Sequence, residues 1–126
     1  MNAPDTIARP TLNAVPILPS LDFSQTRDFY VGNLGFEEVA AACDDYLVVQ
    51  RDGLELHFWL SDDPLQCEST SVFFRTGAPA DFYRDLRERG IDAIMPQGDK
   101  EHPVRFHVRD PHGNLLMFAD AVGISH

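Results

Sequence analysis

The chain has 126 residues, which is enough for one globular domain with a substantial core and too few for two full-sized domains. Hydrophobic residues make up 44% and charged residues 24%, which excludes a disordered, collagen-like or coiled-coil protein. Twenty acidic and ten basic residues give a formal net charge of −10. We therefore expect neither nucleic acid nor an anionic membrane surface as a partner, whereas a cationic ligand would be attracted.

The cellular location is predicted from what the sequence lacks. No apolar run approaches the roughly 20 residues of a membrane-spanning helix, and residues 1–10 contain no apolar stretch typical of a secretory signal. Cys43 and Cys67 are the two cysteines, and they form neither a CxxC motif nor a disulfide framework. These features predict a reduced, cytoplasmic protein.

The first half of the chain alternates turn residues with apolar segments. Pro16 interrupts the first apolar segment, which favours an edge strand. Ser20 or Asp22 can cap a helix, and Gly35 suits its end. The pairs at 44–45 (DD) and 52–53 (DG) suit hairpin turns. The expected elements are a flexible arm at 1–10, a strand at 12–18, a helix at 23–33, strands at 36–42, 46–51 and 54–60, and a polar loop at 61–68.

The second half has the same order of elements. Pro79 suits the first turn of a helix and Gly90 its end, and residues 110–113 (DPHG) are typical of a type I turn. We expect His112, within that turn, to be solvated. The expected elements are strands at 71–76 and 91–95 with a helix at 79–89 between them, a loop at 96–103, and strands at 104–109 and 115–119.

The two halves also share short sequence motifs. The run DFY at 28–30 recurs at 81–83, and LGF at 34–36 corresponds to RGI at 89–91. This repeat predicts a single α+β domain over residues 1–126, made of two paired βαβββ modules at about 11–60 and 70–120. Two such modules side by side would form a curved mixed sheet, and its groove would be the natural ligand site.

The chain resembles the vicinal oxygen chelate superfamily, which includes glyoxalases, dioxygenases and bleomycin resistance proteins. The resemblance rests on 18–23 (LPSLDF), 28–30 (DFY), 34–36 (LGF), 50–59 (QRDGLELHFW) and 109–114 (RDPHGN). The match is closest to the bleomycin resistance proteins, which sequester the drug without changing it. It also implies a homodimer that exchanges its N-terminal strands, and Pro16 matches the proline of the exchanged strand.

Catalytic members of this superfamily bind a divalent metal through His, Glu or Gln side chains from four strands. The resemblance places those positions at Val15, Glu55, Ser71 and Met117. Only Glu55 is a conventional ligand, because valine has no donor atom and thioether and hydroxyl groups bind such cations poorly. The expectation is therefore a protein with no metal site, no cofactor and no catalytic residues.

Strand alternation assigns the side chains that would line the groove. Leu54, Leu56, Phe58 and Leu60 are expected to face the helix. The candidate ligand-binding residues are Glu55, His57, Trp59, Phe73, Arg75, Arg105, His107 and Asp45. Aromatic rings can stack on the flat bithiazole rings of a bleomycin-type antibiotic, and carboxylates can meet its cationic tail.

Several alternatives stay open. Arg75 and Arg105 would instead suit an anionic metabolite. Glu55 and His57 could bond each other, and Trp59 could pack at a subunit interface. Glu55 and His57 could also form a metal site with His107, which would point to an enzyme with a rearranged metal centre. By contrast, the aromatic pairs at 29–30 and 82–83 are expected to belong to the core.

Overall fold

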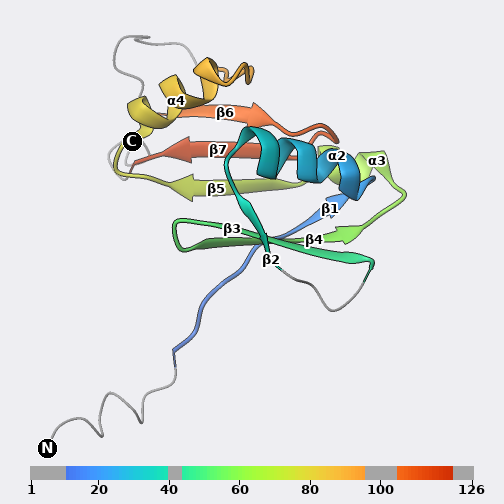
Figure 1. The fold of residues 1–126 in the computed structure, drawn as a ribbon. Helices are drawn as coiled ribbons and strands as arrows, with labels where there is room; N and C mark the ends of the chain where they lie inside the picture. The colour runs from blue at the N-terminus through green and yellow to red at the C-terminus, as the bar shows by residue number, and fades with distance from the viewer. Residues whose placement is uncertain (1–10, 40–43, 96–104, 121–126) are drawn as a thin grey trace, which may run out of the picture.

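The computed structural model describes residues 11–39, 44–95 and 105–120. The first sheet has the strand order β1 (Ile17–Ser20), β4 (Leu54–Leu60), β3 (Tyr46–Arg51), β2 (Glu37–Val39). The second has the order β5 (Ser71–Arg75), β7 (Leu115–Ala119), β6 (Arg105–Arg109). The helical segments are α2 (Phe23–Arg27), η1 (Asp28–Asn33), α3 (Pro64–Glu68) and α4 (Pro79–Glu88) (Figure 1).

Both sheets are mixed and follow one plan. In each, the first strand pairs in parallel with the last strand of its module, β1 with β4 and β5 with β7. The remaining pairs, β2–β3, β3–β4 and β6–β7, are antiparallel. This arrangement confirms the predicted α+β class. No helix among the described residues is long and apolar enough to cross a membrane.

The expected turn chemistry is present at the β3–β4 hairpin and at the helix ends. Asp52 and Gly53 have φ values of 50° and 82°, so both central residues are left-handed, as a two-residue type I′ turn requires. Gly35, with φ 81°, follows the first helix, and Gly90 takes the equivalent place after α4. The helix expected at 23–33 is present, but its second half, η1, is π-helical.

Each sheet packs one face against its own helix. Tyr30 of η1 lies edge-on against Phe58 of β4, with ring centroids 4.7 Å apart. Phe82 of α4 stacks on Phe118 of β7 at 5.9 Å. The two layers share one apolar core, and the aromatic pairs at 29–30 and 82–83 contribute to it as predicted. We call the opposite face, away from the helices, the outer face of each sheet.

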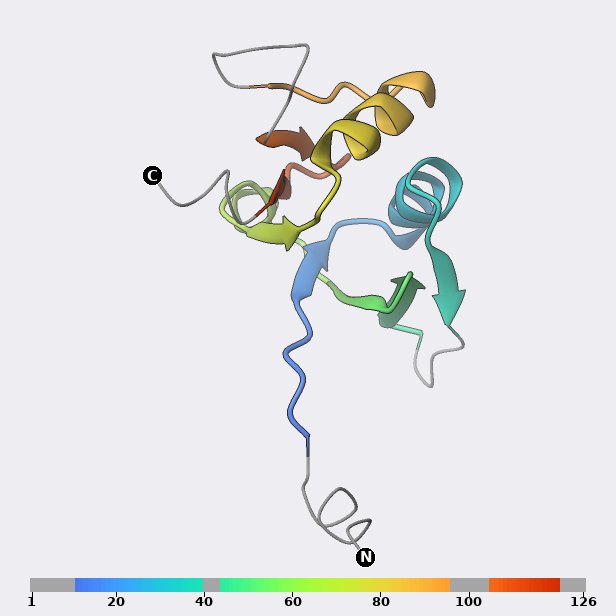
Figure 2. The same cartoon turned by 90° about the vertical axis from the view of Figure 1, so that its left-hand side faces the viewer.

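Three predicted elements differ from the structure. The first strand begins at Ile17, and residues 11–16 instead extend away from the body (Figures 1 and 2). The loop expected at 61–68 contains α3, because Pro64 stands at the first turn and the Asp63 carboxylate accepts from Leu65 N at 3.0 Å. In place of the strand at 91–95 there is a single bridge between Ile94 and His107.

Two further predictions need correction or lie outside the structure. Leu54 and Leu60 share the helix-facing side of β4 with Leu56 and Phe58, but they are 37% and 48% exposed, so only the central residues are buried in the core. Residues at the ends of a strand extend past the helix that covers its middle. The arm at 1–10, the end of the strand at 36–42, Cys43, and the loop at 96–103 lie outside the described residues.

A buried carboxylate organises the turn between β6 and β7. Asp110 Oδ1 accepts from the backbone N–H groups of His112, Gly113 and Asn114 at 2.9, 3.0 and 3.0 Å. Asp110 Oδ2 accepts from the Tyr30 hydroxyl and the Asn114 amide, both at 2.8 Å. Tyr30 comes from the first module, so the carboxylate ties the two modules together.

The same turn contacts the start of the first helix. The Asn114 amide donates to the carbonyl of Pro19 at 2.9 Å, and His112 Nε2 lies 3.3 Å from the carbonyl of Asp22. His112 is 9% exposed, so the prediction of a solvated histidine was wrong. Its burial follows from packing between modules, which the local turn sequence does not reveal.

The titrating groups near this network predict a loss of stability at alkaline pH. Burial raises the pKa of Tyr30, and the Asp110 carboxylate raises it further. Burial also raises the pKa of Cys67, with Asp110 adding to it. A raised pKa in the folded state means that the unfolded chain deprotonates first. The free energy of unfolding should therefore fall as the pH rises above the ordinary thiol and phenol values, roughly 8.5 and 10.

Urea unfolding at several pH values between neutrality and about pH 11 measures this effect. The Tyr30→Phe variant cannot lose the phenolic proton, so its stability should fall less steeply above about pH 10 than that of the wild type. Parallel curves for the two proteins would contradict a role for Tyr30 in the alkaline loss.

Candidate functional site

The outer face of the first sheet presents the three candidate residues of β4. Glu55, His57 and Trp59 alternate with the buried Leu56 and Phe58, as predicted. Trp59 is 36% exposed, so part of its ring is available to a ligand. This face therefore combines an accessible aromatic ring with polar groups.

His57 links two of these side chains. Its Nε2 contacts the Glu55 carboxylate, and its Nδ1 lies 2.6 Å from the Tyr46 hydroxyl. Because a carboxylate only accepts, Nε2 carries the hydrogen, and in a neutral ring Nδ1 accepts from the tyrosine. Glu55 and His57 thus bond each other, one of the alternatives left open by the sequence. The contact holds the carboxylate in place on the outer face.

Tyr46 was missed by the sequence reasoning. It pairs directly with Trp59 in the β3–β4 register, so it shares the outer face. The signal was present, because the two-residue turn at 52–53 sets this register and makes positions 46, 48 and 50 face outward with Trp59.

The outer face of the second sheet is cationic. Phe73, Met117 and His107 form one row across β5, β7 and β6. Arg75 and Arg105 lie on either side of Ala119 in the next row. Neither arginine makes an ion pair or side-chain hydrogen bond with another described residue. Phe73, in the neighbouring row, is 40% exposed. This face offers positive charge and a ring.

The remaining site predictions concern Asp45 and a metal. Asp45 is exposed in the turn that precedes β3. Within the described ranges, no three His, Cys, Asp or Glu side chains gather so as to hold a metal ion. The hypothesis of a site from Glu55, His57 and His107 is therefore wrong for the single chain. His57 and His107 belong to different sheets, and sequence register alone does not place them together.

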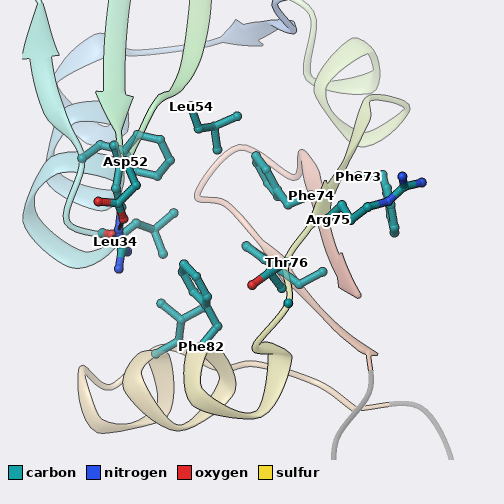
Figure 3. Close-up of a pocket in the computed structure, with 13 residues that line it drawn as sticks. Leu34, Asp52, Leu54, Phe73, Phe74, Arg75, Thr76 and Phe82 are labelled. Carbon is teal, nitrogen blue, oxygen red and sulfur yellow. Dashed lines mark hydrogen bonds and ion pairs between the residues drawn. The ribbon is translucent and has the colours of Figure 1, made fainter. Parts of the chain in front are cut away.

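A cavity of about 420 Å³ lies between the modules. It is lined by the ends of β3, β4 and β5 and by residues of α4, together with Leu34, Phe36 and Phe118. Leu54, Phe74 and Phe82 surround it, whereas Phe73 and Arg75 extend to the other side of β5 (Figure 3). Of the eight candidate ligand-binding residues, Phe73 and Arg75 are thus part of the lining of this cavity and the other six are not.

Comparisons with known proteins identify the family. No sequence-family profile and no curated protein sequence matches this chain. Among solved structures, a bleomycin-binding protein complexed with bleomycin is 31% identical, with a TM-score of 0.74, over 87% of this chain and 98% of that one. A bleomycin resistance determinant encoded on the transposon Tn5 matches with the same values. This chain belongs to the glyoxalase/bleomycin resistance family.

A more distant member of the glyoxalase/bleomycin resistance family agrees with this assignment. A glyoxalase/bleomycin resistance protein from Streptomyces sp. CB03234 is 26% identical, with a TM-score of 0.66, over 86% of this chain and the whole of that one. The resemblance to the vicinal oxygen chelate superfamily, and within it to bleomycin resistance proteins, is confirmed.

The metal-binding positions of the glyoxalase/bleomycin resistance family do not fit a divalent cation here. Ser71 and Met117 lie on neighbouring strands, β5 and β7, and supply a hydroxyl and a thioether. Val15, just before β1, supplies no donor. Glu55 offers the single carboxylate, which already contacts His57. Such a donor set is poor for a hard or borderline cation.

Proposed function

We propose that this protein binds a bleomycin-type antibiotic and holds it without chemical change. The observation that carries the proposal is the 31% identity to a bleomycin-binding protein over nearly all of that protein's length. The unsuitable donor set at the family's metal positions supports binding rather than catalysis.

The outer faces supply the chemistry that such a drug needs. Trp59 and Phe73 are partly exposed rings on which flat bithiazole rings can stack. Glu55 and Asp45 can meet a cationic tail, and cation–π attraction by Trp59 adds to their effect. The net charge of −10 would speed the encounter with a cation.

The proposal includes a homodimer with grooves between the subunits. Residues 11–16 leave the body as an extended segment (Figure 2), and Leu12 within it is 98% exposed. Ile17, where β1 begins, is 55% exposed. In a dimer this segment would lie against the partner, which would cover these apolar side chains.

Calorimetric titration of metal-free bleomycin tests the proposal, with metal content assayed on the same sample. We expect binding near one drug per chain and quenching of the fluorescence of Trp59, the only tryptophan in the sequence. The drug recovered from the complex should have an unchanged mass. Light scattering on the same sample measures the oligomeric state.

Other outcomes would contradict the proposal. Absence of both heat and quenching would exclude bleomycin as the ligand. A stoichiometric metal that is lost on Glu55→Ala, together with altered drug or another turned-over substrate, would indicate an enzyme with a rearranged metal site.

A second candidate is a small anionic metabolite as the ligand. Arg75 and Arg105 flank Ala119 without a carboxylate partner among the described residues, which favours an acidic group there. Replacing both arginines with glutamine would abolish binding of such a metabolite. The same change would leave bleomycin binding intact or strengthen it, so it separates the two candidates.

A further inference from the structure

The cavity between the modules has the character of a ligand site. Its volume of about 420 Å³ lies within the range of small-molecule pockets, roughly 300–1,000 Å³. Its lining contains five phenylalanines, contributed by both modules: Phe36, Phe73, Phe74, Phe82 and Phe118. Leu54 also points into it and is 37% exposed, so the cavity is accessible from solvent (Figure 3). A flat ring would find apolar contacts on several sides.

A guanidinium group lies at the wall of this cavity. Arg51 Cζ is 4.8 Å from the centroid of the Phe82 ring, and the Arg51 side chain is 24% exposed. Its Nη1 donates to the carbonyl of Leu34, which holds the group at this position. A guanidinium has five N–H donors, and those not used here remain for a ligand.

The existing ion pair of Arg51 does not prevent it from binding an acidic ligand, although its partner Asp52 also lines the cavity. Arg51 Nε lies 3.2 Å from the carboxylate of Asp52, whose side chain is 80% exposed. An ion pair that exposed contributes little, so a ligand acid shielded by the phenylalanines can compete with it. The Thr76 hydroxyl also lines the cavity, but its Oγ1 already accepts a hydrogen bond from Ala78 N at 3.1 Å. The second arginine at the wall, Arg75, extends away from the cavity (Figure 3).

We propose that this cavity is a second ligand site, which takes a small aromatic molecule bearing one acidic group. The ring packs among the phenylalanines, and the acid meets the Arg51 guanidinium. This site lies on the helix side of the sheets; its lining includes Phe73, which the proposed drug site also uses, but not Trp59, Glu55 or Asp45. Trp59 reports on the outer face alone, so either proposal can fail while the other stands.

Two fluorescent probes with the same rings test the proposal. 1-Anilinonaphthalene-8-sulfonate carries a sulfonate, and N-phenyl-1-naphthylamine lacks it. We expect the sulfonate probe to bind near one per chain and more tightly than the neutral probe. Arg51→Met should weaken the sulfonate probe roughly tenfold or more, because a charge-assisted hydrogen bond is lost, and should change the neutral probe little. Arg51→Lys should retain part of the preference.

A matched pair of leucine substitutions locates the probes. Leu54→Glu places a carboxylate in the cavity wall and should abolish binding of the sulfonate probe. Leu65→Glu makes the same change on α3, where Leu65 is 69% exposed and away from the cavity, and should have no effect. Equal effects of the two variants would overturn the proposal. Equal weakening of both probes by Arg51→Met would overturn the recognition of the acid.

Amide chemical shifts of the wild-type protein provide a test that does not depend on folding of a variant. Addition of the sulfonate probe should shift the backbone amides of Thr76 and Gly77, which line the cavity. Shifts of the Trp59 indole N–H instead would place the probe on the outer face and overturn the proposal.

Discussion

Replacing Asp110 with alanine is expected to lower the free energy of unfolding by about 3–5 kcal/mol. The carboxylate is 5% exposed and accepts five hydrogen bonds from the turn, Asn114 and Tyr30. Its removal leaves buried donors without an acceptor, which costs more than the bonds contribute on balance. Since domains are stable by about 5–15 kcal/mol, this one change removes a large part of the total. Urea unfolding at neutral pH measures the effect.

Asp62→Ala serves as the control for Asp110→Ala. Asp62 is an exposed loop aspartate with no side-chain partner among the described residues, so its replacement should change stability by less than about 0.5 kcal/mol. A loss below about 1 kcal/mol for Asp110→Ala would show that the turn is held by its backbone alone.

Replacing Trp59 with alanine is expected to weaken bleomycin binding by roughly 30- to 150-fold, or about 2–3 kcal/mol. This expectation rests on the proposed function. Trp59 is a partly exposed ring on the outer face, paired across the strands with Tyr46 and next to the Glu55–His57 contact. A large aromatic anchor in a binding surface typically carries much of the affinity. Trp59→Phe should retain part of it, because a smaller ring can still stack.

The oligomeric state separates two roles of Trp59. Calorimetry and light scattering on Trp59→Ala should show weaker binding by a protein of unchanged size. A variant that loses affinity and dissociates into monomers would indicate instead that Trp59 packs at the subunit interface. Leu65→Ala, an exposed change on α3, should alter neither quantity.

The sequence by itself determined most of the secondary structure and the face of each strand. The alternation in β4 correctly placed Leu56 and Phe58 inside and Glu55, His57 and Trp59 outside. The predicted hairpin turn at 52–53 and the predicted helix ends at Gly35 and Gly90 were also correct. These features depend on neighbouring residues, through a two-residue period and a few backbone angles, so a single sequence contains them. Because the modules repeat, each half supported the interpretation of the other.

Short elements were less well predicted because their signals are weak. The five residues of α3 follow a capping Asp63 and begin with Pro64, but they have no apolar period, so their sequence predicts a loop. The segment expected as a strand at 91–95 forms a single bridge at Ile94, because a run of apolar residues does not show whether its backbone pairs with a neighbouring strand.

The tertiary structure alone decided how distant residues meet. Tyr30 and Asp110 lie eighty positions apart, and their bond is set by packing of the first helix against the turn of the other module. The same packing buries His112 and encloses the cavity beside Arg51. It also keeps His57 and His107 on separate sheets. Such contacts depend on how the two modules are positioned relative to each other. Local periodicity and turn preferences contain no information about that position.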